Sequence, residues 1–143
     1  MIAQYNLGCI YAEGDGVPRN SVEAVKWFVK AAEQGDIDAQ YNLAVLYDDG
    51  TRVEQDYVQA MHWYRQAAEQ GDVDGQFSVG VMYQLGEGVM ADQATAYAWF
   101  SLAANNGHSE ADEKVTGLQE QLSEEDLAKG KTLHSELVER YGM

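Results

Sequence analysis

Apolar, small and polar residues recur along this chain with a fixed period of 36 positions. The tryptophans Trp27, Trp63 and Trp99 mark the period most clearly, and alanine and glycine positions repeat with them. The second of three consecutive repeats matches the first at 18 of 36 aligned positions, and the third matches the second at 11. A repeat of this length indicates that one supersecondary unit has been copied and stacked along the chain.

Within each repeat, apolar residues at helical spacing predict two helices. Asn20, Asp56 and Asp92 fall just before the second helix, where a short side-chain oxygen can accept a hydrogen bond from a free backbone N–H. A glycine follows each second helix, where a left-handed residue commonly closes a helix. We expect the first helix over about 3–13, 38–48 and 74–85, and the second over about 21–34, 57–70 and 93–106.

The end of the chain departs from the repeat. Residues 109–122 predict a polar, degenerate copy of a first helix, and 124–141 predict a final helix with Ser123 as its N-cap. The outer face of the second helix is polar or charged in the first two repeats, but in the third it carries Ala98, Leu102 and Asn105. Because this position loses its charge, we expect the C-terminal helices to fold back over it.

Residues 3–110 resemble three Sel1-like repeats, a relative of the tetratricopeptide repeat with a slightly longer loop. The second repeat carries the resemblance best, through the string Ala39-Gln40-Tyr41-Asn42-Leu43, the pair Trp63-Tyr64 and the string Ala67-Ala68-Glu69-Gln70-Gly71. The resemblance implies an all-α fold, a right-handed α-solenoid of stacked helix–turn–helix repeats of 36 residues. It says little about biochemical role, because such arrays serve as scaffolds in many unrelated pathways.

The domain organisation expected from the repeats is a single solenoid domain over 1–143. Its repeat units are 3–38, 39–74 and 75–110, followed by C-terminal capping helices over 111–143. The chain begins almost inside its first helix, although a repeat array usually starts with a capping element. We therefore expect either that upstream sequence has been removed or that this end associates with another surface.

The charge balance narrows the class of partner. The chain has 24 acidic and 9 basic residues, which give a formal net charge of −15, and residues 75–110 contain no lysine or arginine. Binding to nucleic acid needs a cationic surface, so this balance argues against nucleic acid and against anionic membranes. A basic partner would be attracted. The alternative is that the acidic residues form a solvated face that keeps the array soluble.

Residues suited to catalysis or metal binding are sparse. Cys9 is the only cysteine, so neither an internal disulfide nor a thiolate metal cluster can form. His62, His108 and His134 lie far apart in sequence and show no paired metal spacing. His108 follows a helix end, where a cation suits the helix dipole. We predict a protein that is not an enzyme and has no cofactor and no metal, and we interpret its aromatic residues as core packing.

A partner surface is expected on the first helices, because these line the concave side of helical-pair solenoids. Its candidate residues form an aromatic stripe flanked by amides and acids, onto which a peptide with basic and apolar residues could dock. The alternative is that these aromatics are packing residues of the repeat. The candidate partner-binding residues are Tyr5, Asn6, Glu13, Tyr41, Asn42, Asp49, Phe77 and Ser78.

The sequence therefore favours a soluble bacterial scaffold or adaptor that binds a protein or peptide partner along its concave face. One alternative is a homodimer through the uncapped N-terminal end, where Tyr5, Leu7 and Ile10 would be partly bare. A less favoured alternative is a cell-wall-associated binding protein. The sequence as given shows no signal peptide and no apolar run near the roughly 20 residues that span a bilayer, and it leaves the compartment open.

Overall fold

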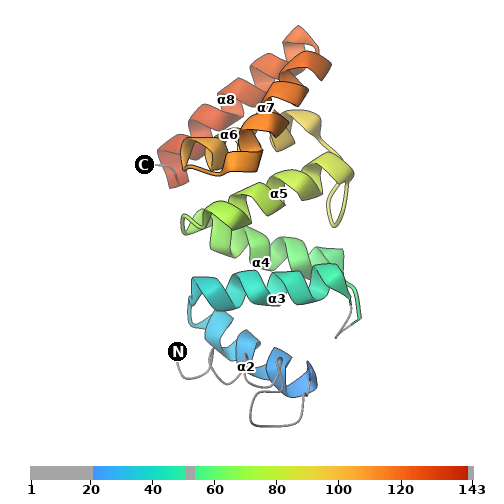
Figure 1. Cartoon of the computed structure of the whole chain (residues 1–143), viewed down its shortest axis with the longest axis vertical. Coiled ribbons are helices and arrows are strands. Elements are labelled where there is room, and N and C mark those ends of the chain that lie inside the picture. The colour runs from blue at the N-terminus through green and yellow to red at the C-terminus, as the bar shows by residue number, and fades with distance from the viewer. Residues whose placement is uncertain (1–20, 51–53, 142–143) are drawn as a thin grey trace. The chain divides into compact units, whose positions relative to one another are not determined.

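The computed structural model describes residues 21–50 and 54–141, with side chains described from residue 25 onward. These residues form seven α-helices and no β-strand (Figure 1). The helix expected over 3–13 lies outside the described residues, and the other expected helices are confirmed to within one residue at either end. The helices are α2 Ser21–Glu33, α3 Ile37–Asp49, α4 Tyr57–Glu69, α5 Val73–Leu85, α6 Gln93–Asn105, α7 Ser109–Gln121 and α8 Glu124–Tyr141.

The chain divides into two compact units, Met1–Ala67 and Ala68–Met143, and each is described by itself. In the first unit, α2 packs against α3, and α4 follows them in the chain. In the second unit, α6 packs against α5, α7 and α8. The expected single domain over 1–143 stays a prediction.

Three of the predicted helix caps are present. Asp56 and Asp92 each accept a hydrogen bond, through a side-chain oxygen, from the backbone N–H three residues later, at 3.1 Å. Ser123 accepts one in the same way before α8, also at 3.1 Å. These bonds satisfy backbone donors that have no partner inside the helix. The fourth predicted cap, Asn20, lies outside the described residues.

The first helices have caps that the sequence analysis did not predict. Asp36 accepts a bond from the backbone N–H of Ala39 at 3.1 Å, and Asp72 accepts one from Gly75 at 3.0 Å. The predicted glycine closures are confirmed, since each of these residues has a strongly positive φ: Gly35 at 93°, Gly71 at 97° and Gly107 at 97°. The helix boundaries of a repeat are therefore fixed locally at both ends.

The core of the first unit lies between α2 and α3. Phe28 and the pair Ala31-Ala32 on α2 pack with Ala39 and Leu43 on α3, and all are buried. Partly buried side chains, Trp63 of α4 among them, pack against this cluster. Small alanines let the helix backbones approach, while the aromatic ring supplies most of the buried apolar area.

The core of the second unit is built around α6. Its side chains are buried from Ala96 to Ala103 without interruption, and Trp99, Phe100 and Leu102 are fully buried. Gly80 on α5 permits one close approach, because a Cβ there would lie 2.7 Å from Cδ1 of Phe100. The burial of Trp99 and Phe100 agrees with the predicted role of these aromatic residues in core packing.

The predicted fold-back of the C-terminal helices is confirmed. Helix α8 packs along α6 (Figure 1), and Ala98 and Leu102 are completely buried. Asn105 Nδ2 lies 2.8 Å from Nε2 of His134 on α8, and the ring of Trp99 stacks with that of Tyr141 at a centroid distance of 6.2 Å. The outer face of α6 is therefore covered by a segment that has no counterpart in the repeats.

Candidate interaction surfaces

The structure describes five of the eight predicted partner-binding residues. Tyr41, Asn42 and Asp49 lie on α3 in the first unit. Phe77 and Ser78 lie on α5 in the second unit. The other three, Tyr5, Asn6 and Glu13, are outside the described residues, as are Leu7 and Ile10 of the predicted homodimer end. The described candidates therefore form two separate groups, one on each unit.

In the first group, an aromatic ring is held against the second helix of the repeat. The half-buried ring of Tyr41 packs on that of Tyr64 with a centroid distance of 5.6 Å. The Tyr64 hydroxyl in turn donates a hydrogen bond to Oδ2 of Asp48 at 3.0 Å. Tyr41 thus takes part in packing, as one interpretation held, and it also keeps part of its ring accessible.

The polar neighbours of Tyr41 differ in how they are held. Asn42 Nδ2 donates a hydrogen bond to the backbone oxygen of Asp38 at 2.8 Å, one helical turn earlier. Its amide is therefore oriented by its own helix. Asp49, at the end of α3, is exposed. The group offers a partly accessible ring, an oriented amide and a carboxylate along one helix.

The second group contains a ring stack. Phe77 is half-buried and lies 5.3 Å from Phe100, measured between ring centroids. On its other side the His108 imidazole stacks almost parallel to it, at 4.2 Å and 8°. Nε2 of His108 lies 3.5 Å from Oδ1 of the exposed Asp74. Ser78, next to Phe77, is half-buried.

His108 lies just past the end of α6, as the sequence predicted, and its interaction with the dipole of that helix stays a prediction. It stands at the N-cap position of α7, where its side chain makes no capping hydrogen bond. Its ring instead packs on Phe77. Sequence spacing did not reveal this stack, because the two residues lie 31 positions apart.

Buried glutamines at one repeat position were also missed. Gln40 Nε2 donates to the backbone oxygen of Ala32 at 3.0 Å, and Gln76 Nε2 donates to that of Ala68 at 3.3 Å. Each bond ties the start of a first helix to the end of the preceding second helix. Asn106 Nδ2 donates to Oε1 of Gln76 at 3.0 Å. The signal in the sequence was a glutamine that recurs with the period.

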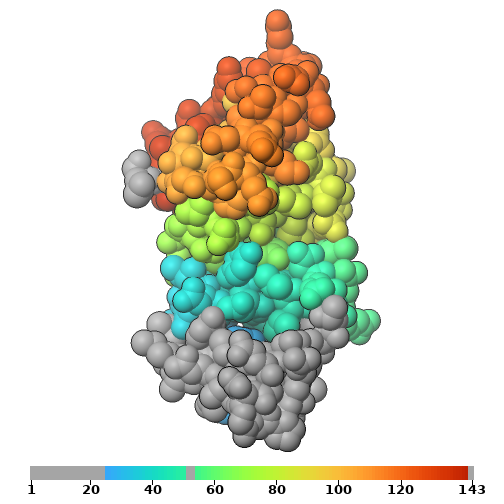
Figure 2. All heavy atoms as spheres, viewed as in Figure 1, coloured from blue at the N-terminus to red at the C-terminus, as the bar shows by residue number. Residues whose placement is uncertain are grey.

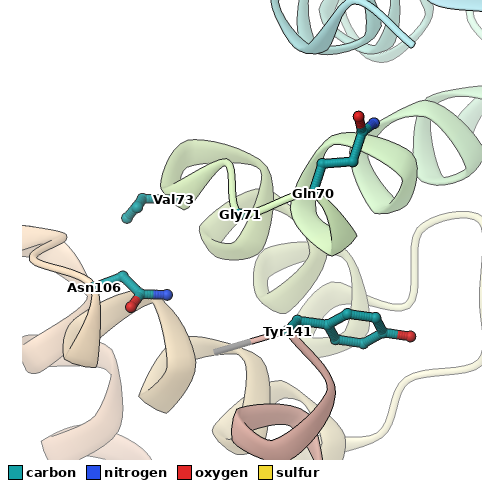
Figure 3. Close-up of a pocket in the computed structure, with 5 residues that line it drawn as sticks. All are labelled: Gln70, Gly71, Val73, Asn106 and Tyr141. Atoms are coloured by element: carbon teal, nitrogen blue, oxygen red, sulfur yellow. The ribbon is translucent and has the colours of Figure 1, made fainter. Parts of the chain in front are cut away.

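The second unit also has an open surface pocket of about 380 Å³, which the sequence analysis did not predict (Figure 3). Val73 and the ring of Tyr141 give it apolar walls, while Gln70 and Asn106 contribute amides. Its lining includes no carboxylate, imidazole or thiol, so general acid–base catalysis by paired groups has no support there. It is lined by Gln70, Gly71, Val73, Asn106 and Tyr141.

Acidic side chains dominate the exposed surface of α7. Glu110, Asp112, Glu113 and Glu120 are exposed, and Figure 2 shows the α7 atoms in orange on the front face of this unit. The lysine of this helix, Lys114, is half-buried, with Nζ 6.0 Å from the centroid of the Phe100 ring. An acidic surface of this kind attracts cationic partners.

The described residues lack both a cluster suited to a metal ion and a helix suited to a bilayer. No group of three or more histidine, cysteine, aspartate or glutamate side chains is placed to hold a metal ion within 21–50 and 54–141. In the same part of the chain, no helix has both the length and the apolar character needed to cross a bilayer.

The chain is similar to known helical-repeat proteins. The family model described as Sel1 repeat matches three times, at residues 2–36, 37–72 and 73–108. No curated protein matches the chain significantly. A Sel1 repeat protein from Oxalobacter formigenes has a crystal structure that is similar, with a TM-score of 0.74 and 34% identity over 81% of this chain and 87% of that one.

Two other solved structures have the same fold. One is a protective antigen present in uropathogenic Escherichia coli strains displaying an SLR fold, with a TM-score of 0.70 and 28% identity. That match covers 99% of this chain and 38% of the antigen. The other is Helicobacter pylori cysteine rich protein B, with a TM-score of 0.62 and 26% identity over 66% of this chain and 71% of that one. These likenesses confirm the predicted all-α solenoid of helical repeats, and the chain belongs to the Sel1 repeat family.

Proposed function

We propose that this chain is a non-enzymatic scaffold that binds a protein or peptide partner carrying basic and apolar residues. Sel1 repeat proteins generally mediate protein–protein interactions. The observation that supports a partner site on the first helices is the shared environment of Tyr41 and Phe77. Both rings stand at the same repeat position, pack on a ring of the following helix, and remain partly accessible.

A partly accessible ring of this kind is suited to binding. Aromatic side chains bury a large area with few rotatable bonds, and they are enriched among the residues that dominate binding energy. The rings already pack on neighbouring rings, so they lose little conformational entropy on binding. We propose that α3 in the first unit and α5 in the second each present such a contact to a partner, since the first helices line the concave side in helical-pair solenoids.

The acids beside the rings determine the kind of partner. Asp38 and Asp49 are exposed on α3, and Asp74 is exposed on α5. A partner with lysine or arginine next to apolar residues would match both the charge and the rings. A carboxylate-terminated peptide would meet repulsion, because it would approach acids at both groups.

The test compares capture of partners from the source cells by two altered chains. One carries Tyr41→Ala, Asn42→Ala and Asp49→Lys on α3, and the matched control carries Glu33→Lys on the exposed side of α2. We expect the α3 variant to lose a partner that the native chain and the control both retain, and the retained complex to weaken at high salt. Equal capture by all three proteins would place the site elsewhere, and capture of no partner would contradict the scaffold function.

A further inference from the structure

Two apolar residues of the third repeat stand where the second repeat has acids. Leu85, the last residue of α5, corresponds to Glu13 and Asp49 of the earlier repeats, and Met90, in the following loop, corresponds to Pro18 and Glu54. Both are prominently exposed, Leu85 by 63% and Met90 by 89%. The replaced positions therefore present apolar side chains to solvent at the end of one helix pair.

The third repeat shows elsewhere what such a replacement means. On the outer face of α6, Ala98 and Leu102 replace the polar His62 and Gln66, and α8 buries them completely. There, an apolar residue at a polar repeat position marks a contact with a segment outside the repeats. By the same reasoning, Leu85 and Met90 indicate a contact with a segment outside the repeats, although no described residue of this chain buries them.

The loop that carries these side chains is closed by hydrogen bonds. The backbone N–H of Asp92 donates to the oxygen of Tyr83 at 2.9 Å, and Gln93 Nε2 donates to the oxygen of Gln84, also at 2.9 Å. Gly86 lies directly against Ala91, since a Cβ on Gly86 would be 3.2 Å from Cβ of Ala91. Figure 1 shows the loop in yellow-green between α5 and α6.

This closure determines where the two apolar residues stand. Leu85 immediately precedes Gly86, and Met90 immediately precedes Ala91, so the close approach of Gly86 to Ala91 brings together the backbone segments that carry the two apolar residues. The backbone that carries the pair is therefore held by these contacts before any partner binds. Preorganisation of this kind lowers the entropy lost on binding, and an unbranched methionine adapts to different apolar surfaces.

Charge decides between the possible occupants. From Gln66 to Glu113 the chain has eight acids and no lysine or arginine, and two of these acids are close to the apolar pair in sequence: Glu87 lies between Leu85 and Met90, and Asp92 follows them. A second copy of the chain would bring this acidic surface against itself, and like charges across an interface are unfavourable. A segment with lysine or arginine beside an apolar anchor has the complementary charge.

We propose that Leu85 and Met90 form an apolar anchor site that binds a basic, apolar segment of a protein partner. This inference rests on the proposed scaffold function and adds to it the position and the chemistry of one contact. The apolar pair would bury the partner's apolar side chain, while Glu87 and Asp92 would face its basic residues.

The test uses the full chain and a synthetic amphipathic peptide of lysine and leucine as the probe. The key variant combines Leu85→Asp with Met90→Glu, which introduces acids like those of the second repeat and adds two negative charges. Attraction by charge alone would make this variant bind the peptide more tightly. If the apolar pair is the anchor, we expect binding at least about tenfold weaker in spite of the added charge, because burial of two large apolar side chains is lost.

Two controls isolate the anchor. Val58 on α4 is also an exposed apolar residue, with 65% of its surface accessible. Its counterparts in the other repeats, Val22 and Ala94, are apolar as well, so this position shows no change from acidic to apolar. Val58→Asp therefore adds an acid at a position outside the proposed anchor. We expect Val58→Asp to leave peptide binding nearly unchanged. A second peptide with serine in place of leucine should bind weakly to the native chain, and hydrogen peroxide should oxidise Met90 more slowly when the lysine–leucine peptide is bound.

The possible outcomes separate this inference from the scaffold function. Unchanged or tighter peptide binding by the double variant, or no peptide binding by the native chain, would overturn the anchor site. Neither result would contradict the scaffold function, because that function is tested separately by the loss of a captured partner in the α3 variant. Light scattering could also show that the native chain is a dimer and the double variant a monomer. The site would then bind a second copy of the chain, and the inference would be overturned.

Discussion

Helices α4 and α6 are the second helices of successive repeats, yet their outer faces have opposite character. Both are 13 residues long, and both begin after a capping aspartate. On α4, His62 and Gln66 are exposed, whereas the corresponding Ala98 and Leu102 of α6 are completely buried. The difference shows that one repeat framework can carry either a solvent-facing helix or a helix enclosed on all sides, according to a few outer positions.

The largest effect on stability should come from removing the helices that cover α6. Truncation after His108 deletes α7 and α8 and exposes Leu102 and part of Trp99. We expect the truncated chain to aggregate or to lose more than about 3 kcal/mol of stability, because full burial of one large apolar side chain contributes about 1.5–3 kcal/mol. Thermal unfolding and light scattering measure this. A monomer of unchanged stability would show that α6 does not depend on its cover.

Single substitutions at equivalent positions of α4 and α6 test the same difference between the two helices. Leu102→Ala should lower the free energy of unfolding by about 2–5 kcal/mol, because it leaves a cavity between α6 and α8. Gln66→Ala, at the equivalent exposed position of α4, should change it by no more than about 0.5 kcal/mol. Urea denaturation of both variants gives the two values. Similar losses at both positions would contradict the difference between the helices.

The fit of α8 on α6 depends on one glycine. A Cβ on Gly130 would lie 2.8 Å from Cδ1 of Tyr97 and 3.1 Å from the backbone oxygen of Ala94, so Gly130→Ala forces the helices apart. We expect a loss of about 1–3 kcal/mol from overpacking. On α7, a Cβ on Gly117 would meet nothing within 4 Å, so Gly117→Ala should stabilise the protein by up to about 1 kcal/mol through helix propensity. If both variants are stabilised, the close approach at Gly130 is not required.

The features of this structure that could be predicted from the sequence are those that recur from one repeat to the next. Helix boundaries were predictable because caps such as Asp56 and Asp92 act within one turn of the chain. The burial of Ala98 and Leu102 was predictable because earlier repeats supplied polar residues for comparison. In each case either a local interaction or a second copy of the position carried the information.

Contacts between residues far apart in sequence could not be predicted in this way. Gly130 meets Tyr97, and His108 stacks on Phe77, and both contacts depend on how α7 and α8 pack. These helices have no full counterpart among the repeats, so no second copy reveals which of their residues face the core. The surface pocket beside Tyr141 was missed for the same reason.

The smallest effect that we expect is on the pH dependence of the α6–α8 contact. Burial lowers the pKa of the His134 imidazole, so the folded protein binds its proton more weakly than the unfolded chain, whose histidine titrates near 6.5. The contribution of His134 to the free energy of unfolding is then fully present above about pH 6.5. It falls as the pH decreases below that value, because proton binding favours the unfolded state. His134→Gln should remove part of this fall, whereas His62→Gln, on the exposed face of α4, should preserve it. Urea denaturation of the three proteins at several pH values measures the effect. An identical pH dependence in native protein and His134→Gln would mean that burial does not lower the pKa of the His134 imidazole in the folded protein.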